Sequence, residues 1–312
     1  MNRAFIFPGQ GSQSIGMGKD FFDSENVAKE VFEEVDSHLK RPLSKIIFHG
    51  SNQELADTAN TQPAIMATSV AILKTILHKT NKNISELCSV VAGHSLGEYS
   101  ALYANKYMSL EQAAKLLEVR SKAMKESCPN GVGAMAACIG IEPHELQAII
   151  AGSITEGICQ IANDNTDGQI VISGHTKNID LIISKLKEQR KKAIKLNVSA
   201  AFHCDLMQNA EQKMILALEK ETFNIPKIDI ISNYTAQQEN SIDKIRNNLQ
   251  QQICGSVKWR ETMNLMAKIG ITELVEIGPG KVLGNLAKKS KCDFTIHSIS
   301  NISQMDDFLE TI

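Results

Sequence analysis

Residues 90–102 have the sequence VVAGHSLGEYSAL, in which Gly93, Ser95 and Gly97 form a G-x-S-x-G pattern. The apolar residues at 90–92 predict the end of a buried strand. The spacing of apolar side chains after Glu98 predicts an amphipathic helix. The pattern therefore falls between a strand and a helix, which is the context in which it marks the turn that carries a nucleophile.

A serine on such a turn has an exposed hydroxyl, because the chain reverses sharply at that residue. Gly93 and Gly97 have no side chains that would clash with the turn. The start of the following helix also places backbone N–H groups and the positive end of the helix dipole beside Ser95, where an oxyanion forms during acyl transfer. We therefore expect Ser95 to be an acyl-accepting nucleophile.

The composition is that of an ordinary globular protein. The chain has 312 residues, 43% hydrophobic and 22% charged, with a formal net charge of -2, so nucleic acid is not expected as its main partner. No apolar run approaches the roughly 18 residues that span a bilayer, and the run at 4–7 is too short for a signal peptide. The seven cysteines include no C-x-x-C pair. We expect neither a zinc site nor a disulfide framework, and a cytoplasmic location.

The N-terminal part of the chain predicts alternating strands and helices, with strands at 3–7 and 87–92 and helices at 26–40, 63–79, 97–106 and 109–126. This order is typical of a mostly parallel sheet covered by helices. The loop PGQGSQSIGMG at 8–18 has neither common phosphate-binding glycine pattern, so a nucleotide site is not favoured. We expect this loop to bring Gln10 and nearby amides toward a site built by other segments. Gln62 stands just before Pro63, at a predicted helix start.

The order of predicted strands and helices changes between 133 and 198, where the pattern predicts the order β-α-β-β-α-β of a ferredoxin-like unit. Further helices and strands follow, including a strand at 274–278 that ends in a glycine turn. The fold class is therefore α/β. We predict a large, α/β-hydrolase-like catalytic subdomain at 1–127 and 199–312, and an inserted ferredoxin-like subdomain at 128–198.

A serine nucleophile needs a base, and histidine is the side chain suited to that role near neutral pH. Five of the eight histidines are expected on the surface: His38, His49, His78, His144 and His175. His94 is expected to point away from the nucleophile and to have a packing role. Two candidates remain. His297 with Glu276 would follow the residue order of α/β-hydrolases, but the HGGG-type loop of those enzymes is missing. His203 lies where the inserted unit returns to the main one, and it is favoured.

Several further motifs occur in a fixed order: PGQGSQ, TQPA, GHSLGEYSAL, LLEVRSKAM, GAMAA, AFH and EIGPGKVL. In this set and order the chain resembles the malonyl-CoA:acyl carrier protein transacylases of bacterial fatty acid synthesis, which are similar to the acyltransferase domains of polyketide synthases. The resemblance covers nearly the whole chain. It is therefore far more specific than the G-x-S-x-G pattern alone.

The resemblance implies catalytic roles for five residues. Ser95 matches the acyl-carrying serine of the family, and His203 matches its base. The base of the family is oriented by a backbone carbonyl, at the position of Gln252. The oxyanion hole uses two backbone amides, which correspond to Gln10 and Leu96.

The resemblance also implies substrate contacts. Arg120 matches an arginine that forms a two-pronged pair with the free carboxylate of malonyl, a geometry suited to a planar guanidinium. From the sequence alone, an arginine with its stem over a helix and its head in solvent is the alternative. Gln62 and Asn165 match polar positions near the site, although a helix cap and a turn residue explain them nearly as well. Phe202, just before the histidine, matches a residue that accompanies malonyl rather than methylmalonyl.

The implied reaction moves a malonyl group from malonyl-CoA to the phosphopantetheine thiol of acyl carrier protein through a malonyl-serine, with no bound cofactor or metal. We expect a monomer with no membrane partner. Because the carrier protein is acidic, a basic rim is expected, with candidates Arg190, Lys191, Lys192, Lys195, Lys288, Lys289 and Lys291. Three alternatives remain open: a hydrolase or thioesterase that uses His297, a polyketide loading enzyme, and a non-catalytic scaffold.

Overall fold

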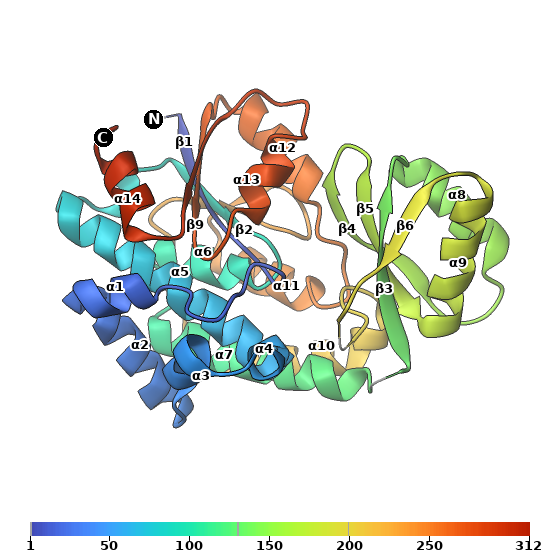
Figure 1. Cartoon of the computed structure of the whole chain (residues 1–312), viewed down its shortest axis with the longest axis horizontal. Coiled ribbons are helices and arrows are strands. Elements are labelled where there is room, and N and C mark those ends of the chain that lie inside the picture. The colour runs from blue at the N-terminus through green and yellow to red at the C-terminus, as the bar shows by residue number, and fades with distance from the viewer. Residues whose placement is uncertain (1, 130, 199) are drawn as a thin grey trace.

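The computed structural model describes residues 2–129, 131–198 and 200–312, and it contains two separate sheets (Figure 1). The larger sheet has the strand order β10, β9, β1, β2, β7, β8. Its strands are β1 (Arg3–Phe7), β2 (Val90–Gly93), β7 (Asp229–Ile231), β8 (Gln238–Glu239), β9 (Glu273–Ile277) and β10 (Thr295–Ile299). Neighbours pair in parallel except β7 and β8. The predicted α/β fold with a mostly parallel sheet is confirmed.

Both faces of the larger sheet are buried, because successive side chains of a strand point to opposite faces. Phe5 and Phe7 of β1 pack in one apolar core, whereas Ala4 and Ile6 pack in another. The first core includes α2 (Asn26–Leu39), α5 (Thr58–Thr80), α6 (Gly97–Ala104) and α7 (Leu110–Ser127). The second includes α12 (Trp259–Lys268) and α13 (Val282–Ala287). Helices on both faces are what a parallel sheet requires.

Helix α5 differs from the prediction, because Pro63 lies inside it and not at its start. Asp57 caps the helix by accepting a hydrogen bond from the backbone N–H of Ala59. A proline leaves the carbonyl four residues earlier without its helical partner. Here Arg41 Nη2 donates to that carbonyl, the oxygen of Ala59, at 2.9 Å. The predicted helix start at 63 is therefore wrong, because the Arg41 side chain supplies the hydrogen bond that Pro63 cannot donate to the Ala59 oxygen.

The second sheet has the order β4, β5, β3, β6, with antiparallel pairing. Its strands and helices are β3 (Gly133–Ile139), α8 (Pro143–Ser153), β4 (Cys159–Thr166), β5 (Gln169–His175), α9 (Thr176–Glu188) and β6 (Lys192–Lys195). Figure 1 shows α8 and α9 on the side of this sheet that faces away from the larger unit. The division into subdomains at 1–127 with 199–312 and at 128–198 stays a prediction, and its boundary residues 1 and 199 lie outside the described residues.

Strand β4 joins the second sheet to the larger unit. Asn163 forms a parallel bridge with Val257, and the N–H of Asp164 donates to the Val257 oxygen at 2.9 Å. Arg260 of α12 holds Asp164 through a two-pronged ion pair, with Nη2 at 2.8 Å from Oδ2 and Nε at 3.0 Å from Oδ1. Paired hydrogen bonds of this kind fix orientation as well as distance. The residues that flank Asp164 are thus held at the junction of the two sheets.

The remaining elements are α1 (Lys19–Ser24), α3 (Leu43–His49), α4 (Asn52–Ala56), α10 (Gln208–Glu219), α11 (Ile242–Gln251), α14 (Ile302–Leu309) and short 3-10 helices at Ile84–Glu86 and Asp205–Met207. No helix in the described ranges is long and apolar enough to cross a membrane. All seven cysteines are free. The described residues contain no cluster of His, Cys, Asp or Glu that could hold a metal ion.

Candidate active site

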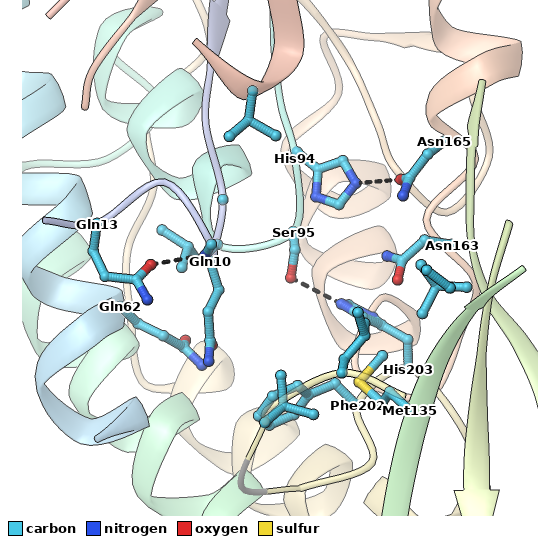
Figure 2. A pocket seen from close by; sticks show the side chains of 18 of the residues that line it. Gln10, Gln13, Gln62, His94, Ser95, Met135, Asn163, Asn165, Phe202 and His203 are labelled. Carbon is cyan, nitrogen blue, oxygen red and sulfur yellow. Dashed lines mark hydrogen bonds between the residues drawn. The ribbon is translucent and has the colours of Figure 1, made fainter. Parts of the chain in front are cut away.

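The G-x-S-x-G pattern forms a sharp turn between β2 and α6. Ser95 has a φ of 52°, in the left-handed region that residues other than glycine rarely adopt. A Cβ atom on Gly93 would lie 1.9 Å from the Gly97 oxygen, and one on Gly97 would lie 2.2 Å from the Phe7 oxygen. Close backbone approach therefore requires both glycines. The strained serine lines a cavity, as Figure 2 shows.

Asn233, which the sequence analysis did not single out, holds this turn in place. Its Oδ1 accepts a hydrogen bond from the backbone N–H of Ser95 at 2.6 Å, and its Nδ2 donates to the Gly93 oxygen at 2.6 Å. Asn233 is fully buried and follows β7, the neighbour of β2 in the sheet. One side-chain amide thus bridges both sides of the strained residue. A polar residue after a buried strand was the signal available in the sequence.

His203 lies against Ser95, with Nε2 at 2.8 Å from the serine Oγ (Figure 2). The other ring nitrogen, Nδ1, is 2.8 Å from the backbone oxygen of Gln252. Because a carbonyl oxygen only accepts, Nδ1 carries the proton, and Nε2 is left to accept the proton of the serine hydroxyl. The pair has the geometry of a hydroxyl nucleophile and its base.

The environment of His203 keeps its imidazole neutral. Burial lowers the pKa of His203 to about 3, the positive charge of Arg120 acts in the same direction, and the hydrogen bond to the Gln252 carbonyl opposes both. Burial disfavours the charged form of an imidazole, and a neighbouring cation does the same. The ring is therefore in the form that can accept a proton at physiological pH.

The other candidate base lies elsewhere. His297 is on β10, where its Nε2 is 3.3 Å from a carboxylate oxygen of Glu273. Glu276, the acid considered for it, accepts a hydrogen bond from the backbone N–H of Leu283 at the start of α13. Neither His297 nor Glu276 is among the described residues that line the cavity. The structure does not bring this pair to Ser95.

Arg120 of α7 is the buried cation of the site, with 1% of its surface exposed. Its Nη2 donates to Ser95 Oγ at 3.1 Å and to Gln252 Oε1 at 2.9 Å, and its Nη1 donates to Gln62 Oε1 at 2.7 Å. All three acceptors are neutral, and Nε has no hydrogen-bond partner within the described part of the chain. The solvent-exposed alternative is therefore wrong for this arginine. A buried guanidinium held only by neutral oxygens is suited to an anionic ligand.

A second buried ionisable residue, Glu98, lies in the first turn of α6. Gln252 Nε2 donates to Glu98 Oε2 at 2.6 Å and to the backbone oxygen of Ser95 at 3.0 Å. Glu98 is 1% exposed, and burial raises its pKa to about 7 although its hydrogen bonds act in the opposite direction. The sequence analysis treated Glu98 only as part of a helix. Its partners are too distant in sequence for the helical pattern to indicate them.

One cavity of about 390 Å³ contains Ser95, Arg120 and His203. Apolar side chains of the second sheet, of the segment after it and of α13 form much of its wall: Met135, Ala137, Val171, Leu196, Val198, Leu283 and Leu286. Figure 2 shows Met135 on the same side of the cavity as His203. Apolar walls with a few convergent polar groups are typical of sites for small ligands. The cavity is shared between segments of both sheets.

Gln10, in the glycine-rich loop after β1, and Leu96, which leads into α6, both line the cavity. Each of these residues has one backbone amide. Neither amide donates a hydrogen bond to another described residue. The loop lies close to the turn, since a Cβ atom on Gly9 would be 2.5 Å from the His94 oxygen. These are the properties of amides that can bind an oxyanion.

His94, Asn165 and Phe202 also line the cavity. His94 Nε2 is 2.8 Å from Asn165 Oδ1, and its ring meets the ring of Trp259 at a centroid distance of 5.6 Å. Burial lowers the pKa of His94. Phe202 is 8% exposed and directly precedes His203. Asn165 reaches the site because β4 is held at the junction of the sheets.

The candidate basic rim is partly neutralised. Lys191, Lys195 and Lys291 form ion pairs with Glu145, Asp180 and Asp167, respectively. Lys288 and Lys289 are exposed at the end of α13, and they form no ion pair with a described residue. Arg190 and Lys192 of the second unit are likewise exposed, with no ion pair to a described residue. Exposed charge without a local counterion is available for steering an acidic partner. Lys288 and Lys289 also follow Leu286, which lines the cavity, so they are the candidates beside the site.

Comparison with known proteins finds a match over residues 4–298 to the family described as "Acyl transferase domain". The malonyl CoA-acyl carrier protein transacylase of Bacillus subtilis (strain 168) is 38% identical over 311 residues, which are 99% of this chain and 96% of the relative. The protein of the same name from Escherichia coli (strain K12) is 36% identical over 308 residues, 98% of each chain.

Solved structures give the same result. The acyl-carrier-protein-S-malonyltransferase of Bartonella henselae superimposes with a TM-score of 0.97 at 41% identity, covering 100% of this chain and 99% of that one. A malonyl-transacylase in complex with its type II polyketide synthase acyl-carrier protein superimposes with a TM-score of 0.96 at 34% identity, with 100% of both chains covered. The resemblance found in the sequence motifs is thus confirmed, and the chain belongs to the acyltransferase family, among the malonyl CoA-acyl carrier protein transacylases.

Proposed function

We propose that this chain moves a malonyl group from malonyl-CoA to the phosphopantetheine thiol of an acyl carrier protein, through a malonyl ester on Ser95. One observation carries the proposal. The Ser95 Oγ lies 2.8 Å from His203 Nε2 and 3.1 Å from Arg120 Nη2. A nucleophile thus stands between a neutral base and a cation that has only neutral partners. This arrangement suits an acyl group that ends in a carboxylate.

In the first half-reaction, the Ser95 oxygen attacks the thioester carbonyl while His203 Nε2 takes the hydroxyl proton. The amides of Gln10 and Leu96 stabilise the oxyanion of the tetrahedral intermediate. The carbon–sulfur bond then breaks, and the imidazolium returns its proton to the leaving CoA sulfur. The backbone oxygen of Gln252 keeps the proton on Nδ1 throughout, so the ring orientation does not change.

The second half-reaction reverses these steps with a different thiol. The phosphopantetheine sulfur attacks the ester carbonyl while His203 takes the thiol proton. The ester carbon–oxygen bond breaks, and the proton returns to the Ser95 oxygen. His203 does all the proton transfer, so the proposed reaction requires no metal or prosthetic group. The apolar cavity wall supports transfer over hydrolysis, because it disfavours water near the ester.

Recognition of the malonyl group is assigned to Arg120, whose planar fork can bind a carboxylate through two hydrogen bonds. Gln62 orients this fork from α5 and Asn165 offers a further polar group. Phe202 lies beside the base, where a larger acyl branch would meet its ring. Discrimination by one methyl group amounts to only about 1 to 3 kcal/mol. We therefore expect methylmalonyl to be disfavoured but not fully excluded.

The proposed macromolecular partner is an acyl carrier protein, with Lys288 and Lys289 near the cavity wall as contacts for its acidic surface. A structural neighbour was solved in complex with a type II polyketide synthase acyl-carrier protein, which supports this assignment. Carrier proteins of fatty acid and polyketide pathways present the same thiol. The proposal therefore includes carrier proteins of either pathway as acceptors. We propose that the protein acts in the cytoplasm as a monomer.

Replacing Arg120 by alanine should lower kcat/KM for malonyl-CoA by about 10²- to 10³-fold, since removing one partner of a buried charge pair costs about 2 to 5 kcal/mol. Acetyl-CoA has no carboxylate, so its kcat/KM should change much less. Transfer of each acyl group to carrier protein is measured for both proteins. The Arg120→Lys variant keeps the positive charge but loses the two-pronged geometry. Its kcat/KM for malonyl-CoA should therefore lie between those of wild type and Arg120→Ala. Equal losses for malonyl and acetyl would contradict the assigned role.

The positive charge of Arg120 beside His203 should affect the pH dependence of kcat/KM. Because the pKa of His203 is lowered to about 3, the base stays unprotonated between pH 8 and pH 5. Wild-type kcat/KM for acetyl-CoA should therefore show no loss from protonation of His203 over this range. Arg120→Ala removes one cause of the lowering, so the acidic limb of the profile should move to higher pH. Arg120→Lys keeps the charge and should leave the limb low. The assignment is contradicted if wild-type kcat/KM falls on the acidic side with the ordinary pKa of histidine and if this apparent pKa is unchanged in Arg120→Ala.

A further inference from the structure

Glu98 is a buried ionisable residue to which the proposed mechanism assigns no step. It lies in the first turn of α6, three positions after the nucleophile, and is 1% exposed. Its Oε2 accepts hydrogen bonds from Gln252 Nε2 at 2.6 Å and from the backbone N–H of Asn233 at 3.3 Å. The first of these is a short contact. A buried carboxyl group is costly, so its contacts deserve a functional explanation.

Gln252 connects this carboxyl group to the rest of the site. Its backbone oxygen accepts from His203 Nδ1, and its side-chain Oε1 accepts from Arg120 Nη2 at 2.9 Å. Its Nε2 donates to both Glu98 and the backbone oxygen of Ser95. Every described contact of the side-chain amide therefore depends on which of its ends is the oxygen.

The amide of a glutamine can be turned by half a rotation, which exchanges its oxygen and its NH₂ group. In the turned state, the NH₂ group of Gln252 would face the guanidinium of Arg120, and two donors would meet. Its oxygen would face the oxygens of Glu98 and Ser95. Glu98 makes this state unfavourable, because the oxygen that faces Gln252 is an acceptor. The Asn233 N–H holds that oxygen in the same place.

We infer that Glu98 is a positioning residue for malonyl recognition, which fixes the Gln252 amide with its oxygen toward Arg120 and so holds the guanidinium toward the acyl group. This inference rests on the proposed function. It assigns Glu98 no contact with substrate and no proton transfer. Burial raises the pKa of Glu98 to about 7. Both the ionised and the neutral carboxyl group can present an acceptor oxygen to Gln252, so the device does not require the charge.

The test compares Glu98→Leu, which removes the acceptor, with Glu98→Gln, which keeps an oxygen available at a similar size. The quantity measured is the ratio of kcat/KM for malonyl-CoA to that for acetyl-CoA in transfer to carrier protein. Glu98→Leu should lower this ratio by about tenfold, the order expected when one buried hydrogen-bond partner is lost. Glu98→Gln should restore the ratio to within about threefold of wild type. Equal ratios in wild type and Glu98→Leu, or no rescue by Glu98→Gln, overturn the inference.

A double-substitution cycle separates positioning from general damage. If Glu98 acts through Arg120, adding Glu98→Leu to Arg120→Ala should lower the ratio no further. Full additivity of the two effects on the ratio contradicts the inference. Asn105→Leu is a control that removes a fully buried polar side chain at the other end of α6, where it accepts from the backbone N–H of Tyr107 at 3.1 Å and does not line the cavity. This control should keep the malonyl-to-acetyl ratio of wild type.

Gln252→Leu provides a second route if Glu98→Leu does not fold. This variant keeps the backbone oxygen that orients His203 and removes the side-chain oxygen that orients Arg120. It should therefore lower the same ratio, and an unchanged ratio overturns the inference. The wild-type arm distinguishes the two proposals. Wild type that fails to transfer malonyl refutes the proposed function and the inference with it, whereas active wild type with unmoved ratios refutes the inference alone.

Discussion

Ser95→Ala should abolish acyl transfer, with a loss in kcat of about 10⁴- to 10⁶-fold, as when the nucleophile is removed from other serine enzymes. The reason is structural. The Ser95 hydroxyl donates to His203 Nε2 and accepts from Arg120, and the described site brings no other hydroxyl to the base. Without the oxygen, neither half-reaction can form its covalent intermediate. Binding of malonyl-CoA should persist, because Arg120 and the cavity wall are unchanged.

The measurement is the steady-state rate of malonyl transfer to carrier protein, with malonyl-CoA binding measured separately. Ser100→Ala is a matched control. Ser100 lies on α6, the helix that follows Ser95, is fully buried, and has a hydroxyl with no hydrogen-bond partner among the described residues. Its loss should leave kcat within a few-fold of wild type. Retention of transfer by Ser95→Ala would falsify the nucleophile assignment.

His203→Ala should lower kcat by about 10³- to 10⁴-fold, since base catalysis and activation of the nucleophile are lost together while the oxyanion hole remains. The 2.8 Å contacts on either side of the imidazole, to Ser95 and to the Gln252 carbonyl, support this size of effect. Among the described residues, His203 supplies the ring nitrogen that contacts Ser95 Oγ, whereas Nε2 of the neighbouring His94 contacts Asn165. Added imidazole at high concentration should restore part of the rate.

His297→Ala is the matched comparison for this prediction. His297 of β10 pairs with Glu273 of β9, away from the cavity, so its removal should change kcat by less than about threefold. The products are measured as malonyl carrier protein and as free malonate. A hydrolase or thioesterase would show the reverse pattern, with a large loss for His297→Ala, a small one for His203→Ala, and free acid as its main product.

Local sequence patterns were enough to predict the strand, turn and helix around Ser95, because all three lie within a few residues. The β-α-β-β-α-β order of the second sheet was equally visible from alternating runs. The start of α5 was not, because Arg41 satisfies the carbonyl that Pro63 leaves free. Propensity cannot anticipate a hydrogen bond from a side chain so distant in the chain.

The site shows the same limit. The family motifs implied that Gln252 lies near His203, but nothing in the local pattern connected Asn233 or Glu98 to the turn. These residues act across separations of 138 and 154 positions, from Asn233 to Ser95 and from Glu98 to Gln252. A helix pattern indicates which face of a helix is buried. The pattern does not identify the polar group of another element that will contact that face.

The central claim is that Ser95 carries the malonyl group between the two thiols. The most direct measurement is mass spectrometry of the protein after brief mixing with malonyl-CoA in the absence of carrier protein. The account predicts a malonyl ester on the peptide that contains Ser95, and its disappearance when carrier protein is added. Full turnover by a protein that never shows this adduct would contradict the account.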